Sequence, residues 1–262
     1  RSARARRAML IDFRRAGLGP QLEADVCVVG GGAAGMTLAM EIAKHSVIVL
    51  ESGGLEFDAK VQDLYKGDNV RGDFSLDTSR FRMLRGTTFA WGGWCSPLDT
   101  IDFQRRDWVR DSGWPITKQD LHPYYQRAQR LCQLGRYRYD IADWPALATK
   151  TLALDPAKLE HRLWQFSPPS RFGQAFRSAL SGGTNVRVLL KSTVTQIVTG
   201  ENADAVKEVR IGALDGTRAT VRARVYIIAC GGIETARLLL VSNAVDAKGL
   251  GNRHDLVGRY FM

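Results

Sequence analysis

Residues 26–51 read VCVVGGGAAGMTLAMEIAKHSVIVLE, and this stretch decides the fold. The apolar runs 26–29 and 47–50 predict two short strands, each buried on both faces of a parallel sheet. Between them, apolar side chains recur from Met36 to Ala43 at helical spacing, which predicts a helix with one buried face. The stretch therefore predicts a strand–helix–strand unit whose first turn is built from glycines.

That turn, residues 30–35, has the G-x-G-x-x-G spacing of dinucleotide-binding folds. Gly30 permits a tight turn, Gly32 lets a pyrophosphate approach the backbone, and Gly35 lets the helix pack closely on the strand. The helix N-terminus offers free N–H groups to phosphate, and Glu51 is placed to accept hydrogen bonds from a ribose diol while repelling a 2′-phosphate. The unit predicts a site for NAD or for the ADP half of FAD. The alternative is a glycine turn that binds nothing.

A second strand with a glycine turn lies near the end of the sequence, where the apolar run 225–229 meets Cys230 and Gly231. A helical pattern follows over residues 233–242. A return to the same nucleotide after about 200 residues is typical of flavoproteins whose FAD domain is interrupted. The strands of an NAD dehydrogenase usually follow one another more closely. This turn favours FAD, and an ordinary strand–turn–helix is the alternative.

A third segment, residues 80–99, reads RFRMLRGTTFAWGGWCSPLD. Its small residues, hydroxyls and tryptophan suit close backbone approach to a flat ligand that carries a pyrophosphate. Its arginines can neutralise phosphates. The segment therefore predicts a further contact with the same nucleotide.

With these segments the chain resembles the glucose–methanol–choline (GMC) oxidoreductases, which are FAD-dependent alcohol and sugar oxidases and dehydrogenases. Within that family it is most similar to the bacterial sugar dehydrogenases and pyranose oxidases. The resemblance spans about residues 10–262 and rests on ordered motifs, which are 30–35 with Glu51, 84–97, 102–103 with Trp108, 112–115, 121–125, 229–240 and 255–262.

The resemblance implies FAD as the cofactor and assigns it contacts in the two glycine turns, in the segment 80–99, just after the strand 47–50, and at Val194. Four residues of the first turn would hold the pyrophosphate, Glu51 the adenosine ribose, and the backbone of Val194 the adenine. The full set of expected cofactor-binding residues is Gly30, Gly32, Ala33, Gly35, Glu51, Ser52, Arg82, Gly86, Thr87, Thr88, Ala90, Trp91, Gly92, Val194, Cys230 and Gly231.

Two positions depart from the family pattern. Arg85 stands where the family usually has glycine, so that turn is reshaped or the arginine points outward. Ala90 stands where some relatives carry the histidine that tethers FAD covalently. We therefore expect FAD to be bound non-covalently.

No catalytic residue is assigned in this chain. The family's base is a histidine paired with another histidine or an asparagine, in a C-terminal portion that we expect beyond Met262. The histidines present are expected on the surface or in structural packing, and they are His45, His122, His161 and His254. The four cysteines lack metal-ligand spacing, so no metal is predicted. Without the C-terminal portion, we expect low stability or self-association.

The sequence thus predicts an α/β fold, namely a FAD/NAD(P)-binding Rossmann-like domain with a central parallel sheet, β-hairpin additions and a mixed helical and loop insertion. We expect a disordered basic tail over 1–9 and a FAD-binding domain over 10–262. That domain is split as 24–54 and 185–262 around an insertion at 55–184. Further expected elements are helices at 118–134 and 171–181, a strand at 186–190, and a hairpin of 206–211 and 217–225 turning at Asp215–Gly216.

Charge and hydropathy limit the partners. The net charge is +10, but residues 1–15 hold six arginines against Asp12, so half of the excess lies in one terminal segment. We expect no nucleic-acid partner, and the apolar runs are too short for a membrane span. The expected partners are a sugar or alcohol substrate and an electron acceptor such as oxygen, a quinone or a cytochrome. A cytoplasmic location is expected, with the periplasm left open.

Three functions remain open at this point. The first is the FAD-binding portion of a GMC-type enzyme that oxidises a CH–OH group of a sugar or other alcohol by hydride transfer to flavin. The second is a flavin-binding module that needs a separate chain for catalysis. The third is an NAD-dependent dehydrogenase that shares only the first motif.

Overall fold

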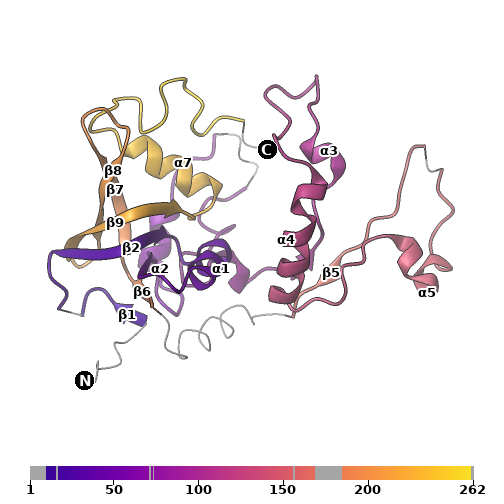
Figure 1. Ribbon diagram of the computed structural model, residues 1–262, viewed down its shortest axis with the longest axis horizontal. Helices are drawn as coiled ribbons and strands as arrows, with labels where there is room; N and C mark the ends of the chain where they lie inside the picture. The colour runs from indigo at the N-terminus through magenta and orange to yellow at the C-terminus, as the bar shows by residue number, and fades with distance from the viewer. Residues whose placement is uncertain are drawn as a thin grey trace. The chain divides into compact units, whose positions relative to one another are not determined.

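The structure is a computed structural model that describes residues 10–260, apart from 16, 71, 73, 156 and 169–184. These residues form a seven-stranded sheet in the order β1-β6-β3-β2-β9-β8-β7 (Figure 1). The parallel strands are β1 (Leu10–Asp12), β6 (Val186–Leu190), β3 (Val47–Leu50), β2 (Gln21–Val29) and β9 (Arg218–Ile228). Two antiparallel strands, β8 (Val206–Gly212) and β7 (Thr193–Thr199), extend one edge. The predicted α/β fold with a central parallel sheet is confirmed.

Strand β2 lies at the centre of the parallel part, with β3 on one side and β9 on the other. It is five residues longer than the apolar run predicts, because it pairs with β9 from Gln21 onwards. Strand β9 in turn forms the expected hairpin with β8. Because β2, β3 and β9 are parallel, their carboxyl ends lie at the same edge of the sheet.

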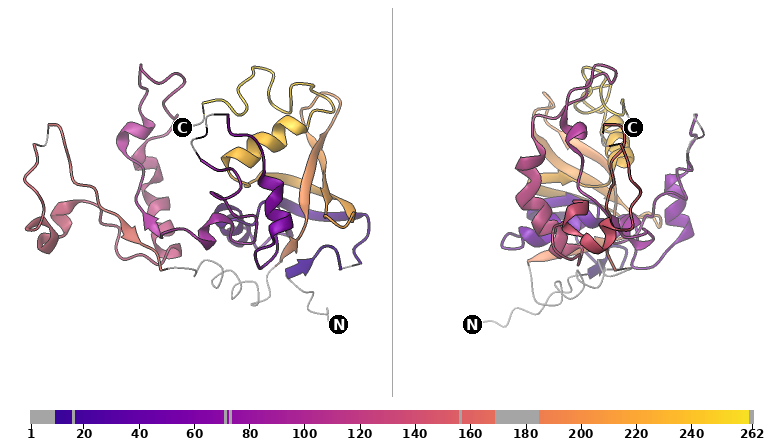
Figure 2. Two further views of the ribbon diagram at one scale, coloured as in Figure 1. Left: turned by 180° about the vertical axis from the view of Figure 1, so that it is seen from behind. Right: turned by 90° about the vertical axis from the view of Figure 1, so that its right-hand side faces the viewer.

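Two helices begin at that edge. Helix α1 (Ala33–Glu41) follows β2, and α7 (Gly232–Val241) follows β9. Shorter pieces, α2 (Ala59–Gln62) and the 3-10 helices η1 (Asp63–Tyr65) and η2 (Gly86–Phe89), follow β3. Helix α7 packs on the sheet, where the hydroxyl of Ser242 accepts a hydrogen bond of 2.9 Å from the backbone N–H of Ile197. Figure 2 shows α7, in yellow, beside the orange strands of the sheet.

The core lies within this sheet and against these helices. The side chains with no exposed surface include Cys27, Val28, Ile48, Val49, Val188 and Ile211. Cys27 is a core residue, as expected, and burial raises the pKa of its thiol to about 12. The apolar parts of the central strands therefore serve the fold.

The chain divides into two compact units, one of described residues from 1–89 and 172–262 and one from 90–171. The second unit contains α3 (Thr100–Phe103), α4 (Lys118–Leu131), the 3-10 helix η3 (Ile141–Asp143) and α5 (Pro145–Ala148). A short pair of β4 (Trp94–Cys95) and β5 (Gln165–Phe166) accompanies them. Helix α4 confirms the predicted helix, and Thr117 with Asp120 forms its capping box.

Some expectations are not decided by this division. Packing into units does not identify which residues were inserted, so the boundaries 24–54, 55–184 and 185–262 stay predictions. The tail 1–9 and the helix expected at 171–181 lie outside the described residues.

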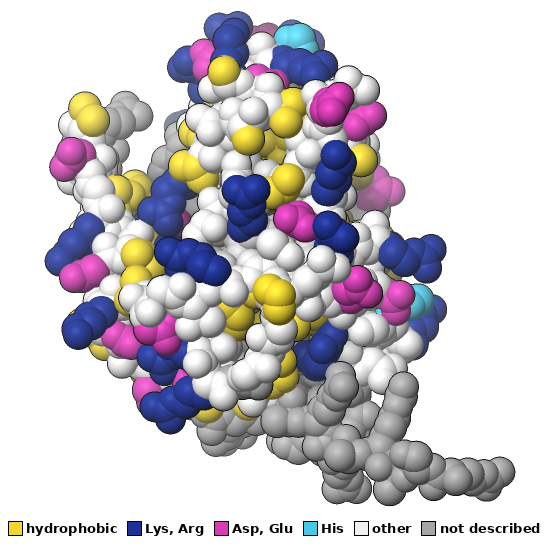
Figure 3. Space-filling model, turned by 90° about the vertical axis from the view of Figure 1, so that its left-hand side faces the viewer, with side chains coloured by type: hydrophobic (Ala, Val, Ile, Leu, Met, Phe, Trp, Pro, Cys, Tyr) yellow, Lys and Arg dark blue, Asp and Glu magenta, His cyan; other side chains and the backbone are white. Residues whose placement is uncertain are grey.

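On the face drawn in Figure 3, Lys and Arg side chains are interspersed with acidic and apolar ones. No described helix is both long and apolar enough to cross a membrane.

Candidate nucleotide-binding site

The two glycine turns, about 200 residues apart in sequence, touch at the carboxyl edge of the sheet. Gly30 has a φ of +106°, and a Cβ there would lie 2.5 Å from the carbonyl oxygen of Ala229 and 3.0 Å from the Cα of Cys230. The backbone of Gly30 also donates to the carbonyl of Leu50 at 2.9 Å. The ends of β2, β3 and β9 thus meet at one point, as the sequence predicts for a second turn that returns to the first.

Each glycine of the first turn occupies a distinct environment. A Cβ at Gly35 would lie 2.0 Å from the carbonyl oxygen of Gly30, so no side chain fits between α1 and the turn. Gly32 is the N-cap of α1, and a Cβ there would meet no described atom within 4 Å. No described side chain caps α1, so its first N–H groups stay available to a ligand. The turn therefore combines a closed side at Gly35 with an open side at Gly32, as a pyrophosphate site requires.

Glu51 follows β3 and is only 6% exposed. Its Oε2 accepts from the backbone N–H of Gly31 at 2.9 Å, and its Oε1 accepts from that of Gly53 at 2.7 Å. Burial raises the pKa of Glu51, while these two hydrogen bonds and the charge of Arg82 act in the opposite direction. A carboxylate offers about four lone-pair positions, so two remain for a ribose diol. Glu51 therefore also stabilises the glycine turn, and the sequence motif does not reveal this second role.

The third segment also reaches the glycine turn. Arg85 donates its backbone N–H to the carbonyl of Gly31 at 2.9 Å, and a Cβ at Gly86 would lie 3.3 Å from the Cα of Gly32. Thr87 and Thr88 follow in η2, where the hydroxyl of Thr88 donates to the carbonyl of Arg85 at 2.6 Å. Three segments distant in sequence therefore converge on the backbone of one turn.

Arg85 stands where the family usually has glycine, and the structure shows how the turn accommodates it. Its φ of +94° is a value that glycine adopts far more easily. Its guanidinium lies over the ring of Phe89, 5.1 Å from the ring centroid. The turn thus keeps a glycine-like backbone, and the side chain packs beside it.

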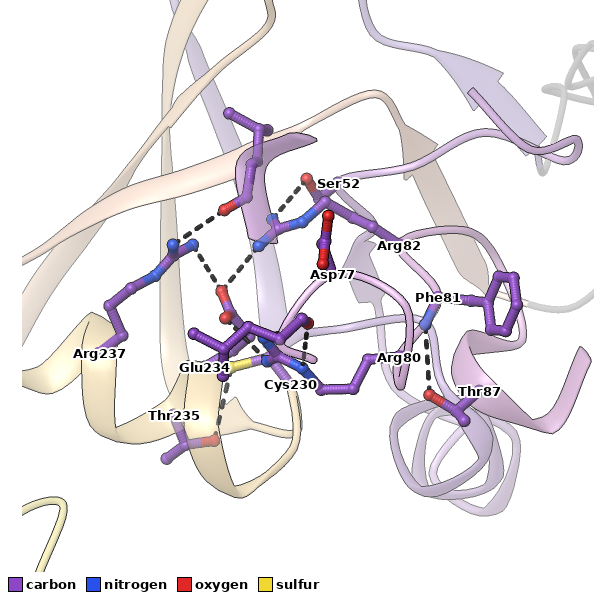
Figure 4. Close-up of polar contacts among 12 residues, drawn as sticks. Ser52, Asp77, Arg80, Phe81, Arg82, Thr87, Cys230, Glu234, Thr235 and Arg237 are labelled. Carbon is purple, nitrogen blue, oxygen red and sulfur yellow. Dashed lines mark hydrogen bonds and ion pairs between the residues drawn. The ribbon is translucent and has the colours of Figure 1, made fainter. Parts of the chain in front are cut away.

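Arg82 and Ser52 lie behind the turn in a polar network (Figure 4). Arg82 donates from Nη1 to the hydroxyl of Ser52 at 2.9 Å and pairs through Nη2 with Glu234 at 2.7 Å. The Ser52 hydroxyl also lies 2.7 Å from that of Thr193. Arg82 Nε is buried and has no hydrogen-bond partner among the described residues. The sequence motifs single out Arg82 and Ser52, but they give no sign that Glu234 is their partner.

The other expected contacts are less sharply defined by the structure. Val194 is the second residue of β7, opposite Ile211, and is half-buried beside the core. Cys230 is half-buried with its Sγ 3.5 Å from the hydroxyl of Thr235, and burial raises the pKa of this thiol. Ala33 lies in the first turn of α1, and Gly231 is the N-cap of α7 with a φ of +82°. The remaining three expected residues, Ala90, Trp91 and Gly92, belong to the second unit.

The histidines form no catalytic grouping in the described chain. His45 is exposed in the loop before β3 and His254 is exposed near the end of the chain. His122 is exposed but lies against the ring of Tyr137, and a ring nitrogen of His161 lies 3.0 Å from the carbonyl oxygen of Leu152. No group of three or more His, Cys, Asp or Glu residues in the described regions is placed to hold a metal ion.

The fold and this convergence of glycine turns define the chain as a dinucleotide-binding α/β protein. Comparison with known proteins narrows the class. Residues 171–261 match the family model described as GMC oxidoreductase. The chain is 27% identical to 6'''-hydroxyparomomycin C oxidase of Streptomyces lividus, over 90% of this chain and 53% of that protein.

Two solved structures share the fold. The crystal structure of pyridoxine 4-oxidase from Mesorbium loti matches with a TM-score of 0.54 and 19% identity, over 82% of this chain and 51% of that one. A fungal aryl-alcohol oxidase matches with a TM-score of 0.55 and 15% identity, over 84% and 47%. The chain therefore spans about half the length of these relatives.

Residues 171–261 therefore match the N-terminal part of the GMC oxidoreductases, and over 90% of its length the chain is similar to an oxidase. FAD is the cofactor that this similarity implies. The structure fits it, since the backbone is open at Gly32, no described side chain caps α1, and the buried Nε of Arg82 has no acceptor among the residues that the structure describes.

Proposed function

We propose that FAD binds at the carboxyl edge of β2, β3 and β9, and that the whole protein oxidises a CH–OH group of a sugar or other alcohol. The observation that carries the site is the convergence of three distant segments, 30–35, 85–86 and 229–231, on one uncapped helix N-terminus. The activity is supported by relatives whose names are those of a hydroxyparomomycin oxidase and an aryl-alcohol oxidase.

The ADP half of FAD is assigned to the first unit. Gly30, Gly32, Ala33 and Gly35 would hold the pyrophosphate through backbone N–H groups, which the dipole of α1 reinforces. Glu51 would hold the adenosine ribose with the lone pairs that its backbone contacts leave free. The backbone of Val194 would hold the adenine. This arrangement needs no side-chain movement at Gly32, where the space above the Cα is open.

The flavin half is assigned to the segments that flank the turn. Gly86, Thr87, Thr88, Ala90, Trp91 and Gly92 would lie along the flavin and its linking chain, with Cys230 and Gly231 on the other side. Ser52 and Arg82 would support the pyrophosphate, and Arg82 Nε is a donor without an acceptor in the described part of the chain. Because Ala90 replaces the tethering histidine of some relatives, FAD should be released when the protein is denatured.

Bound FAD supplies a hydride acceptor for oxidation of the alcohol carbon. The described residues bind and orient this cofactor, and none of them is proposed to accept the hydroxyl proton. The candidate electron acceptors are oxygen, a quinone and a cytochrome. Alcohol turnover assayed with each acceptor in turn would separate oxidase from dehydrogenase. An isolated chain that binds FAD without turnover, and gains turnover when a second chain is added, would favour the binding-module alternative.

The FAD site is tested by substituting alanine for one glycine that faces open space. We expect Gly32→Ala to raise the Kd for FAD at least roughly tenfold, because the new methyl group occupies the space of the pyrophosphate. Stability without FAD should change little, since no described atom lies within 4 Å of that Cβ. Binding is measured by flavin fluorescence and stability by urea unfolding.

Gly19→Ala is the matched control, because a Cβ there also meets no described atom within 4 Å and Gly19 lies outside the proposed site. It should leave both FAD binding and stability unchanged. Wild-type FAD affinity in Gly32→Ala would refute the proposed position of the pyrophosphate.

A further inference from the structure

We propose that Glu234 is a positioning residue of the cofactor site. By fixing Arg80 and Arg82, its carboxylate holds the segment 80–88 against the glycine turn. The inference rests on the proposed function, which places FAD at that turn. Among the described residues, the ion-pair partners of Glu234 are arginines outside the glycine turn, so its effect on the cofactor passes through the arginine-bearing segment.

Glu234 is a buried carboxylate shared by three arginines. Its side chain is 9% exposed and lies in the first turn of α7. One oxygen lies 2.9 Å from Arg80 Nη1, and the other lies 2.7 Å from Arg82 Nη2 and 2.5 Å from Arg237 Nη2. Figure 4 shows the three guanidinium groups directed at this one carboxylate. A buried group with three charged partners has little freedom to reorient.

Tyr65 limits the same arginines from another side. The guanidinium carbons of Arg80 and Arg82 each lie 4.1 Å from the centroid of its ring. If Glu234 were neutral, the positive charges of Arg80 and Arg82 would remain close together in a largely buried region, beside the half-exposed Arg237, and would repel one another. We therefore infer that the carboxylate is what keeps Arg80 and Arg82 in place.

Arg82 is connected to the glycine turn by the backbone of residues 82–85. The backbone N–H of Arg82 donates to Gln62 at 2.9 Å, and its side chain holds Ser52. Two and three residues further on, Leu84 donates to the carbonyl of Gly54 and Arg85 to that of Gly31, each at 2.9 Å. A shift of Arg82 therefore displaces the backbone that lies beside Gly31 and Gly32.

The same carboxylate connects the two sides of the proposed site. Glu234 lies three residues after Gly231, the N-cap of α7, whereas its partners Arg80 and Arg82 lie on the segment that leads to Gly86. The ion pairs thus bridge residues more than 150 positions apart. Loss of the charge should loosen the spacing between the two backbone turns that approach FAD.

The test compares Glu234→Gln with Glu208→Gln. Glu208 is the control because its carboxylate also pairs with an arginine, Arg222, at 3.1 Å, but on strands away from the carboxyl edge. We expect Glu234→Gln to raise the Kd for FAD at least tenfold and to speed backbone hydrogen exchange over residues 84–88 in the FAD-free protein. Glu208→Gln should change neither quantity. Glu234→Asp, which keeps the charge, should recover part of both.

The two measurements separate this inference from the proposed function. If the wild type does not bind FAD, the proposed function fails, while the exchange of 84–88 still reports whether Glu234 holds that segment. A Glu234→Gln protein with wild-type FAD affinity and wild-type exchange over 84–88 would overturn the inference. So would a loss of stability alone with both quantities unchanged. If Glu234→Gln does not fold, Glu234→Asp is compared with the wild type on the same two quantities, and equality overturns the inference.

Discussion

At the scale of single residues, the site depends on backbone conformations that side chains normally avoid. Gly30 and Gly231 both have positive φ and are glycines, so their conformations carry no steric cost. Arg85 has a similar φ of +94° and carries a full side chain. The cost of that conformation is partly offset by the contact of its guanidinium with the ring of Phe89.

This leads to a prediction about stability at Arg85. Arg85→Gly should exceed Arg85→Ala in free energy of unfolding by about 1 kcal/mol, because both lose the contact with Phe89 and only glycine relieves the strained φ. Urea unfolding of the two variants in the same buffer measures the difference. If alanine proved as stable as glycine, the positive φ at this position would carry no strain.

At the scale of elements, continuous apolar runs predict where buried strands lie, but they do not predict which strands distant in sequence pair with each other. Strands β3 and β6 match the predicted ranges 47–50 and 186–190 because both are buried on both faces and almost wholly apolar. Strand β7 was not singled out, since threonine and glutamine interrupt its apolar residues and its pairing with β8 is irregular. The extent of β2 depends on its partner β9, which the sequence of β2 does not contain.

The candidate site shows the same limit. The motif predicted that Gly30, Gly32 and Gly35 share one turn, because their roles depend on local spacing alone. It missed Glu234, because an ion pair with Arg82 joins residues 152 positions apart and leaves no periodic signal. The backbone contacts of Glu51 were missed for a related reason, since a motif names the side chain but not its other partners.

An element-scale prediction concerns the ion pair that holds α2 to the turn after β6. Lys191 Nζ lies 2.6 Å from Asp58, and this hydrogen bond lowers the pKa of that carboxyl below its ordinary value of 3.8. A lowered pKa gives stability that is present above the ordinary value and is lost as the pH falls through the lowered one. The side chain of Asp58 is 35% exposed, and solvent there screens the ion pair, so its contribution is at most about 1 kcal/mol.

Asp58→Asn keeps an N-cap acceptor for α2 and removes only the charge. Its free energy of unfolding should therefore lie below that of the wild type at neutral pH and approach it below the lowered pKa. Urea unfolding at a series of pH values checks this. Asp63→Asn, which removes a carboxylate from an exposed pair with Lys66, serves as the control and should show a smaller difference. A difference at Asp58 that does not vary with pH would contradict the ion-pair account.

At the scale of the whole molecule, the proposed contacts lie in both units. Addition of FAD should therefore slow backbone hydrogen exchange at 31–35, 86–88 and 230–232 in the first unit and at 90–92 in the second. Mass spectrometry of peptides with and without FAD measures this. The hairpin turn at 213–217 is the internal control, because the eleven residues of β9 place it roughly 35 Å from the carboxyl edge. Slower exchange at 31–35 without any change at 90–92 would remove Ala90, Trp91 and Gly92 from the proposed site.

The contact between Gly30 and Ala229 also has a consequence for biosynthesis. A ribosome adds roughly 5 to 20 residues per second, so roughly 10 to 40 seconds separate the synthesis of these two residues. During that interval β2 has no β9 to pair with, and its apolar edge is open to other chains. The nascent protein should therefore acquire its cofactor late, and chaperones that cover exposed strands should raise its yield more than added flavin does.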